Sequence, residues 1–238
     1  QAGVRFSINN PDAYFESNIH GFFNMIELSK NYKVKHFIFA SSSSVYGDAK
    51  YFPTDESANT DKPLSFYAAS KKSNEVMAYS YSNIYKLKCT GLRFFTVYGP
   101  LGRPDMALFK FVNNIYNNKK ISLFNNGNHK RDFTYIDDVI YSMIKIMNKK
   151  INKKIPYTIL NIGGNDPKNL NFFLKIISKY IGKKPSIKFL DKQKGDVKIT
   201  HADNKKLIKL IGNYKKTSLN LGIKKFVSWY QKKYIKKS

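Results

Sequence analysis

Residues 36–47 read His-Phe-Ile-Phe-Ala-Ser-Ser-Ser-Ser-Val-Tyr-Gly. The apolar run that ends at Ala40 is typical of a short strand buried inside a sheet. The four serines that follow, Ser41 to Ser44, predict a polar turn at the carboxyl end of that strand. Because open α/β sheets bind their ligands at the carboxyl ends of strands, this turn is the first candidate for a functional site.

The rest of the chain alternates between helical and strand patterns. Apolar residues recur at helical spacing over 11–31, 66–85, 105–118, 137–148 and 169–180, and a last helix closes the chain. Strand patterns cover 36–40, 89–96, 121–124 and 157–162. This alternation predicts an α/β protein built on a mostly parallel sheet.

The composition indicates a folded chain without disulfides or membrane spans. The chain has 238 residues, 42% of them hydrophobic, which is enough for a sizeable core. Its single cysteine, Cys89, cannot form an internal disulfide and fits a reducing compartment. No run approaches 18 uncharged apolar residues, and the first residues do not resemble a signal peptide. We therefore expect a soluble, cytoplasmic protein with no membrane partner.

The net charge of +26 raises the question of nucleic acid, because basic surfaces gain affinity by releasing counterions from phosphates. However, 38 of the 42 basic residues are lysines, and they are spread along a chain that also carries 24 asparagines. Spread charges are typical of a solvated surface, whereas binding needs clustering on one face. We expect no nucleic-acid partner, although a basic binding protein without catalysis remains an alternative. The four histidines show no ligand spacing with Cys89 or with one another, so no metal site is expected.

Tyr67 and Lys71 lie four residues apart, on one face of the helix expected over 66–85. A nearby ammonium favours the phenolate, so a tyrosine in this setting can work as a base near neutral pH. The spacing alone does not select Tyr67, because four other pairs share it: Tyr46/Lys50, Tyr116/Lys120, Tyr141/Lys145 and Tyr180/Lys184.

The surroundings of Tyr67 carry a stronger signal. Ser42 lies 25 residues before it, so a strand, a serine turn, a polar loop and a helix with Tyr-x-x-x-Lys follow in order. This order resembles the extended short-chain dehydrogenase/reductase family and, within it, the NAD-dependent epimerases and dehydratases. The resemblance implies a Rossmann-like, doubly wound parallel sheet with a smaller α/β substrate-binding region. It also implies that Ser42, Tyr67 and Lys71 form the catalytic set.

Further stretches extend the resemblance over essentially the whole chain. Residues 91–106 are similar to the family segment that lies along the nicotinamide and the sugar, and residues 124–139 to the one that meets the UDP diphosphate. The resemblance implies bound NAD, contacted by Asn18, Ala40, Ser41, Tyr67, Lys71 and Phe94. It also implies a UDP-sugar substrate, contacted by Ser43, Ser44, Thr96, Arg103, Arg131 and Asp196.

The residue before Val45-Tyr46-Gly47 separates activities within the family. Sugar dehydratases and decarboxylases place an acid there, whereas this chain has Ser44, which favours an epimerase. The four serines with Thr96 and Arg103 are most similar to UDP-glucuronate 4-epimerases. The implied reaction inverts C4 of UDP-glucuronate, giving UDP-galacturonate through a transient 4-keto sugar. Epimerases of UDP-glucose or UDP-N-acetylglucosamine, and sugar-nucleotide dehydratases or decarboxylases, remain alternatives.

Two further expectations concern the extent of the domains. Residues 1–100 are expected to form the C-terminal part of the NAD-binding domain, and residues 101–238 mainly the UDP-sugar-binding region, with segments crossing back. The family's first strands and its Gly-rich phosphate-binding turn have no counterpart after Gln1. We therefore expect a fragment that binds NAD poorly and is inactive alone, unless a second polypeptide supplies those parts.

The resemblance also implies a homodimer, formed through the helices expected over 11–31 and 66–85. Six apolar side chains on these helices are candidates for the dimer face, with packing against the sheet as the alternative: Phe22, Phe23, Ile26, Met77, Tyr81 and Tyr85.

Overall fold

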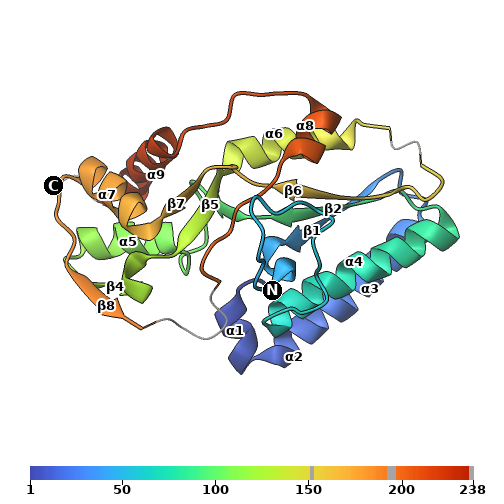
Figure 1. The fold of residues 1–238 in the computed structure, drawn as a ribbon, viewed down its shortest axis with the longest axis horizontal. Helices are drawn as coiled ribbons and strands as arrows, with labels where there is room; N and C mark the ends of the chain where they lie inside the picture. Colours follow the sequence, from blue (N-terminus) through green and yellow to red (C-terminus); the bar gives the residue numbers. More distant parts are fainter. Residues whose placement is uncertain (151–152, 192–196, 236–238) are drawn as a thin grey trace. The chain divides into compact units, whose positions relative to one another are not determined.

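A computed structural model describes residues 1–150, 153–191 and 197–235 (Figure 1). The chain forms two compact units and crosses between them several times. The first unit consists of Gln1–Phe95, Ser142–Ile162 and Ala202–Asn213, and the second of Thr96–Tyr141, Gly163–His201 and Tyr214–Ser238. Neither unit is a continuous segment. The assignment of cofactor and substrate roles to residues 1–100 and 101–238 stays a prediction.

The first unit is built on a parallel sheet of three strands. These are β1 (Phe37–Ser42), β2 (Cys89–Phe94) and β6 (Tyr157–Ile162), paired in the order β1-β2-β6. Ser42 pairs with Phe94 and Phe94 with Ile162, so the three carboxyl ends lie along one edge. The predicted parallel α/β arrangement is thereby confirmed. The strand expected over 89–96 is interrupted at Phe95, because Thr96 already belongs to a strand of the second unit.

Helices cover this sheet. The chain starts with α1 (Val4–Asn9), α2 (Pro11–Tyr14), the π-helix η1 (Phe15–His20) and α3 (Gly21–Asn31), so the single helix expected over 11–31 contains a π-helical stretch. The helix α4 (Phe66–Tyr85) has the predicted bounds and is capped by Ser65, whose Oγ accepts a hydrogen bond from the Ala68 amide at 3.1 Å. α3 and α4 pack side by side (Figure 1), and α8 (Lys205–Ile211) contacts β6.

The core of the first unit lies between the sheet and these helices, and it is formed by Ile26, Phe39, Ala78, Leu87, Cys89 and Ile159. Gly91 lies in this core with little free space around its Cα. A Cβ at this position would lie 2.5 Å from Ile159 Cδ1 and 2.7 Å from Phe39 Cζ, so a larger residue would force both side chains to move. Burial raises the pKa of the Cys89 thiol to about 12, so this side chain stays neutral and packs as a small apolar group.

The six side chains expected at a dimer face divide between core and surface. Ile26 is buried, and Phe22 and Tyr81 pack against the same core, so these three contact the sheet side of the unit. Met77 is half-buried, and Phe23 and Tyr85 remain exposed. The homodimer therefore stays a prediction.

The second unit has two small sheets. β3 (Thr96–Tyr98) pairs parallel with β5 (Lys130–Tyr135), which pairs antiparallel with β7 (Pro167–Asn169). β4 (Ile121–Phe124) pairs parallel with β8 (Ile187–Leu190). The prediction found β4 with its bounds but missed β5, because that strand begins with three charged residues, Lys130, Arg131 and Asp132.

The second unit's core is rich in stacked aromatic rings. The rings of Phe133 and Phe173 lie 4.1 Å apart and nearly parallel. The surrounding helices are α5 (Ala107–Tyr116), the start of α6 (Ile136–Met147), α7 (Leu170–Ile181) and α9 (Leu219–Tyr234), and a short 3-10 helix η3 covers Asn125–Gly127. In the part of the chain that the structure describes, no helix is long and apolar enough to cross a bilayer.

A buried ion pair joins the sheet of the first unit to α4. Arg93 of β2 and Glu75 of α4 are 4% and 3% exposed, and Nε and Nη2 of the arginine donate to the two carboxylate oxygens at 2.8 Å. Nη1 also donates to the Glu56 carbonyl at 3.2 Å, and the guanidinium lies 4.7 Å from the centre of the Tyr46 ring. Burial disfavours the charged guanidinium, yet its hydrogen bonds to Glu75 raise the pKa of Arg93 above its usual range. Arg93 therefore stays charged at this buried position.

This pair gives a test of stability. Replacing Glu75 by Leu leaves Arg93 buried without its carboxylate, and we expect a loss of about 3–5 kcal/mol in the free energy of unfolding. The double substitution Glu75→Leu with Arg93→Met removes both charges, so it should cost less than Glu75→Leu alone. Urea unfolding of the full-length protein measures both values, with Glu16→Leu on the surface as the control. A double variant less stable than Glu75→Leu would contradict this account.

Candidate active site

β1 continues to Ser42, two residues past the end expected at Ala40, so Ser41 and Ser42 belong to the strand and the turn itself starts at Ser43. Ser42 is buried, and its Oγ accepts a hydrogen bond from the Ser44 amide at 3.1 Å, which caps the 3-10 helix η2 (Ser43–Tyr46). Gly47 closes the turn with φ +56°, and a Cβ there would lie 2.6 Å from the Lys62 carbonyl oxygen. Ser43 and Ser44 are half-buried. The turn therefore holds its hydroxyls in a fixed backbone frame at the carboxyl edge of the sheet.

The helix α4 brings Tyr67 and Lys71 to this turn. α4 contacts both β1 and η2, and Lys71 Nζ donates to the Ala40 carbonyl at 3.0 Å. Burial lowers the pKa of Lys71. Tyr67 is half-buried, one turn earlier on the same face, and its ring packs edge-on against Tyr14 at 6.0 Å. The Tyr-x-x-x-Lys pair and the serine turn thus belong to one neighbourhood of the first unit.

The side chain of Ser41 lies in a different environment from that of Ser42. It is 3% exposed, and its Oγ donates to Glu75 Oε1 at 2.6 Å. The hydroxyl is therefore committed to the buried pair of Glu75 and Arg93. Any contact of Ser41 with a cofactor would have to use its backbone.

The other expected cofactor residues surround the same edge. Asn18 of η1 is buried, its Nδ2 donates to Ser70 Oγ at 3.0 Å, and its carbonyl accepts from Asn74 Nδ2 at 2.6 Å. Phe94, half-buried at the end of β2, is the register partner of Ser42. Hydroxyls, an ammonium and an aromatic ring at adjacent strand ends fit the hydroxyls of a ribose and the flat ring of a nicotinamide. The residues present therefore fit the nicotinamide half of NAD.

The expected substrate residues belong mostly to the second unit. Thr96 starts β3 and is half-buried. Arg103 is exposed, and its Nη2 lies 2.9 Å from Asp105 Oδ2. Arg131 of β5 donates from Nη1 to the Lys130 carbonyl at 3.1 Å. Asp196 lies outside the described residues. The approach of these four to the serine turn stays a prediction.

Glu75 was not predicted as a site residue, and Arg93 had no predicted role. Glu75 follows Lys71 by four residues, so Tyr67, Lys71 and Glu75 share one face of α4. This spacing could have indicated a role for Glu75. A carboxylate on a buried helix face needs a positively charged or hydrogen-bonding partner, and Tyr67 and Lys71 place this face toward the site. Its partner Arg93 comes from a neighbouring strand, and this contact exists only in the folded chain.

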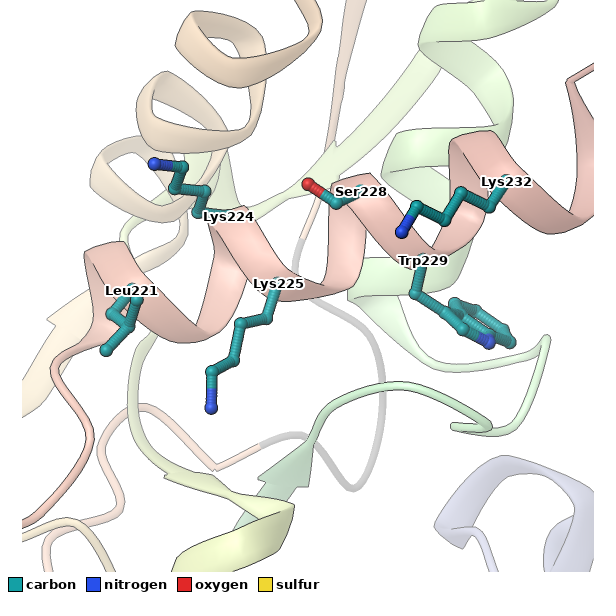
Figure 2. A pocket seen from close by; sticks show the side chains of 6 residues that line it. All are labelled: Leu221, Lys224, Lys225, Ser228, Trp229 and Lys232. Atoms are coloured by element: carbon teal, nitrogen blue, oxygen red, sulfur yellow. The ribbon is translucent and has the colours of Figure 1, made fainter.

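A hollow of about 430 Å³ lies elsewhere, on the surface of α9 (Figure 2). It is lined by Leu221, Lys224, Lys225, Ser228, Trp229 and Lys232, none of which is an expected site residue. Figure 2 shows three lysine side chains projecting from one helix around it. Among the described residues, no group of three or more His, Cys, Asp or Glu side chains is placed to hold a metal ion.

This chain is similar to several known proteins, and some of them are named UDP-glucuronate 4-epimerase. The chain is 46% identical over 250 residues to the protein CapI of Staphylococcus aureus, covering 99% of this chain and 75% of CapI. It is 42% identical over 230 residues to the UDP-glucuronate 4-epimerase of Thermodesulfobacterium geofontis, covering 96% of this chain and 69% of that protein.

A solved structure supports the same relationship. The UDP-glucuronic acid 4-epimerase of Bacillus cereus, solved with UDP-glucuronic acid and NAD, superposes with a TM-score of 0.91 at 32% identity, covering 98% of this chain and 73% of that one. This agrees with the Rossmann-like fold expected from the sequence. Residues 1–163 match the family model described as NAD dependent epimerase/dehydratase. With this match over most of its length and these relatives, the chain belongs to the NAD dependent epimerase/dehydratase family.

Proposed function

We propose that this protein inverts C4 of UDP-glucuronate, giving UDP-galacturonate. One observation carries the proposal: Lys71 Nζ lies 3.0 Å from the Ala40 carbonyl, so the helix with the Tyr-x-x-x-Lys pair adjoins the serine turn. The Thermodesulfobacterium and Bacillus relatives bear the name of this activity and support the choice among the family's reactions.

The proposed chemistry centres on Tyr67. As a phenolate it takes the proton of the sugar's 4-hydroxyl, and Ser42 hydrogen-bonds to the same oxygen and orients it. Bound NAD would accept hydride from C4 and return it. The transient 4-keto sugar then has to turn its other face before the hydrogen returns, so the sugar is inverted with no net oxidation.

Lys71 supports Tyr67 in this proposal. Lys71 is half-buried, and burial lowers the pKa of its side chain. A partly desolvated charge acts more strongly on a neighbouring oxygen than one in water, because the local dielectric is lower. Lys71 therefore favours the phenolate form of Tyr67 and is expected to hold the nicotinamide ribose. Asn18, Ala40, the Ser41 backbone and Phe94 would complete the NAD contacts.

Substrate recognition would combine small hydroxyls with arginines. Ser43, Ser44 and Arg103 would bind the C6 carboxylate, because a guanidinium can donate two parallel hydrogen bonds to it. Thr96 would face the hexose, Arg131 the diphosphate and Asp196 the nucleotide ribose. Ser44 supports an epimerase, since no carboxyl group stands there to assist elimination or decarboxylation.

An epimerase acting on UDP-glucose or UDP-N-acetylglucosamine is the second candidate. Both substrates differ from UDP-glucuronate at C6, where they carry no carboxylate, and UDP-N-acetylglucosamine also differs at C2. Arg103, which is exposed and paired with Asp105, is expected to distinguish these substrates. Its positive charge would complement a C6 carboxylate, and among the three sugars only glucuronate carries one.

The direct test incubates the full-length protein with UDP-glucuronate and NAD and follows the sugar protons by NMR. UDP-galacturonate should accumulate to an equilibrium mixture without net reduction of NAD. Conversion of UDP-glucose alone would support the second candidate. Release of carbon dioxide, or a 4-keto-6-deoxy product, would show the proposal to be wrong.

Tyr67→Phe tests the proposed base. Removing one hydroxyl should reduce turnover by about 10²- to 10⁴-fold, the range typical for loss of a general base. Affinity for the UDP-sugar, measured by calorimetry, should stay close to that of the unsubstituted protein. Tyr51→Phe is the control, because Tyr51 is 85% exposed. Full activity in Tyr67→Phe would eliminate Tyr67 as the base.

A further inference from the structure

Two contacts, one helical turn apart on α4, tie this helix to the end of β1. Lys71 Nζ donates to the Ala40 carbonyl at 3.0 Å, and Glu75 Oε1 accepts from Ser41 Oγ at 2.6 Å. Consecutive residues of the strand thus meet residues at i and i+4 of the helix. The next strand residue is Ser42, and the preceding turn of the helix carries Tyr67.

The two contacts are not equivalent. Lys71 is half-buried, and the proposed function gives its ammonium another task. Glu75 has no such task, since its carboxylate is 3% exposed and bound by Arg93 through both oxygens. Ser41 adds a third donor to this carboxylate. Of these two contacts with β1, only the one between Ser41 and Glu75 is therefore expected to persist while Lys71 is engaged elsewhere.

The position of the carboxylate is itself fixed from several sides. Arg93 contacts the Glu56 carbonyl and the Tyr46 ring, and Tyr46 OH donates to Asn161 Oδ1 of β6 at 2.6 Å. The Glu75 main-chain carbonyl accepts from Tyr157 OH at 3.1 Å. Glu75 is thus anchored to β2 and β6, and Ser41 connects this anchor to β1.

We propose that Ser41 and Glu75 are positioning residues, which set the register of α4 against β1 so that Tyr67 and Lys71 face Ser42. Neither is expected to touch the reacting atoms. The catalytic part of this inference rests on the proposed function, whereas the structural part concerns only the backbone at the end of β1 and the first turns of α4.

Two substitutions of Ser41 test this inference. Ser41→Ala removes the hydroxyl that reaches Glu75 but leaves the Arg93–Glu75 pair intact, whereas Ser41→Thr keeps a hydroxyl at Cβ and suits a strand. Ser73→Ala is the matched control, because the Ser73 hydroxyl donates to Ala69 within α4 and not to the sheet.

The experiment uses the full-length protein with three readouts: steady-state kinetics with UDP-glucuronate, thermal unfolding, and hydrogen exchange of residues 39–42 and 66–72. For Ser41→Ala we expect kcat to fall about 10- to 100-fold with KM changed less than about twofold, because a displacement near 1 Å is enough to cost this much. Amide exchange should accelerate in both segments with little change in the melting temperature. Ser41→Thr should restore kcat and exchange, and Ser73→Ala should change neither.

Unchanged kcat and unchanged exchange in Ser41→Ala would overturn the inference. So would an equal effect of Ser73→Ala, or a loss of kcat that follows a loss of the folded state. If the unsubstituted protein does not convert UDP-glucuronate, the proposed function fails. The exchange comparison then decides alone whether Ser41 and Glu75 hold α4 to β1.

Discussion

The buried pair of Arg93 and Glu75 is the constraint on which the first unit depends. Removing an ion from water costs several kcal/mol, so a buried pair survives only with close geometry and with its remaining donors and acceptors satisfied. Here the two bonds at 2.8 Å join β2 to α4, and Ser41 adds a donor from β1. Because these requirements are directional, they allow few placements of the helix. Lys71 and Tyr67, one and two turns before Glu75, take their positions from the same constraint.

Further hydrogen bonds connect the residues around Arg93 and Glu75 to the serine turn. Burial raises the pKa of Tyr46 to about 12, and its hydroxyl donates to Asn161 Oδ1. Asn161 Nδ2 donates in turn to the Thr54 carbonyl at 2.9 Å, and its backbone amide to Glu56 Oε1 at 2.8 Å. Tyr46 ends the 3-10 helix that contains Ser43 and Ser44, so the turn is held through β6 as well as through β1. Polar groups with this many partners favour one rigid arrangement.

Much of this arrangement could be predicted from the sequence, and the limits have physical causes. The apolar run before Ser41 and the helical spacing of apolar residues over 66–85 follow local rules, so β1 and α4 were both predicted. Glu75 was missed because its role comes from Arg93, a partner on another strand. Strand β5 was missed because Asp132 is buried there, against the usual preference of carboxylates for water, and Thr200 Oγ1 accepts from its backbone amide at 3.1 Å. The net charge of +26 predicted nothing specific, since 38 of the 42 basic residues are lysines spread along the chain, and the role expected for Lys71 comes from its position on α4.

We propose that the site around the serine turn would hold the sugar beside NAD, so that the hydrogen at C4 would pass to NAD as hydride and return to the other face of the sugar. The most direct measurement uses UDP-glucuronate that carries deuterium at C4, incubated with the full-length protein and NAD in ordinary water. Mass spectrometry and NMR then locate the deuterium in the UDP-galacturonate formed. The account predicts that deuterium stays at C4 of the inverted sugar, because the hydrogen never exchanges with solvent. A product with ordinary hydrogen at C4 would contradict it, since inversion would then proceed through a proton exchanged with water.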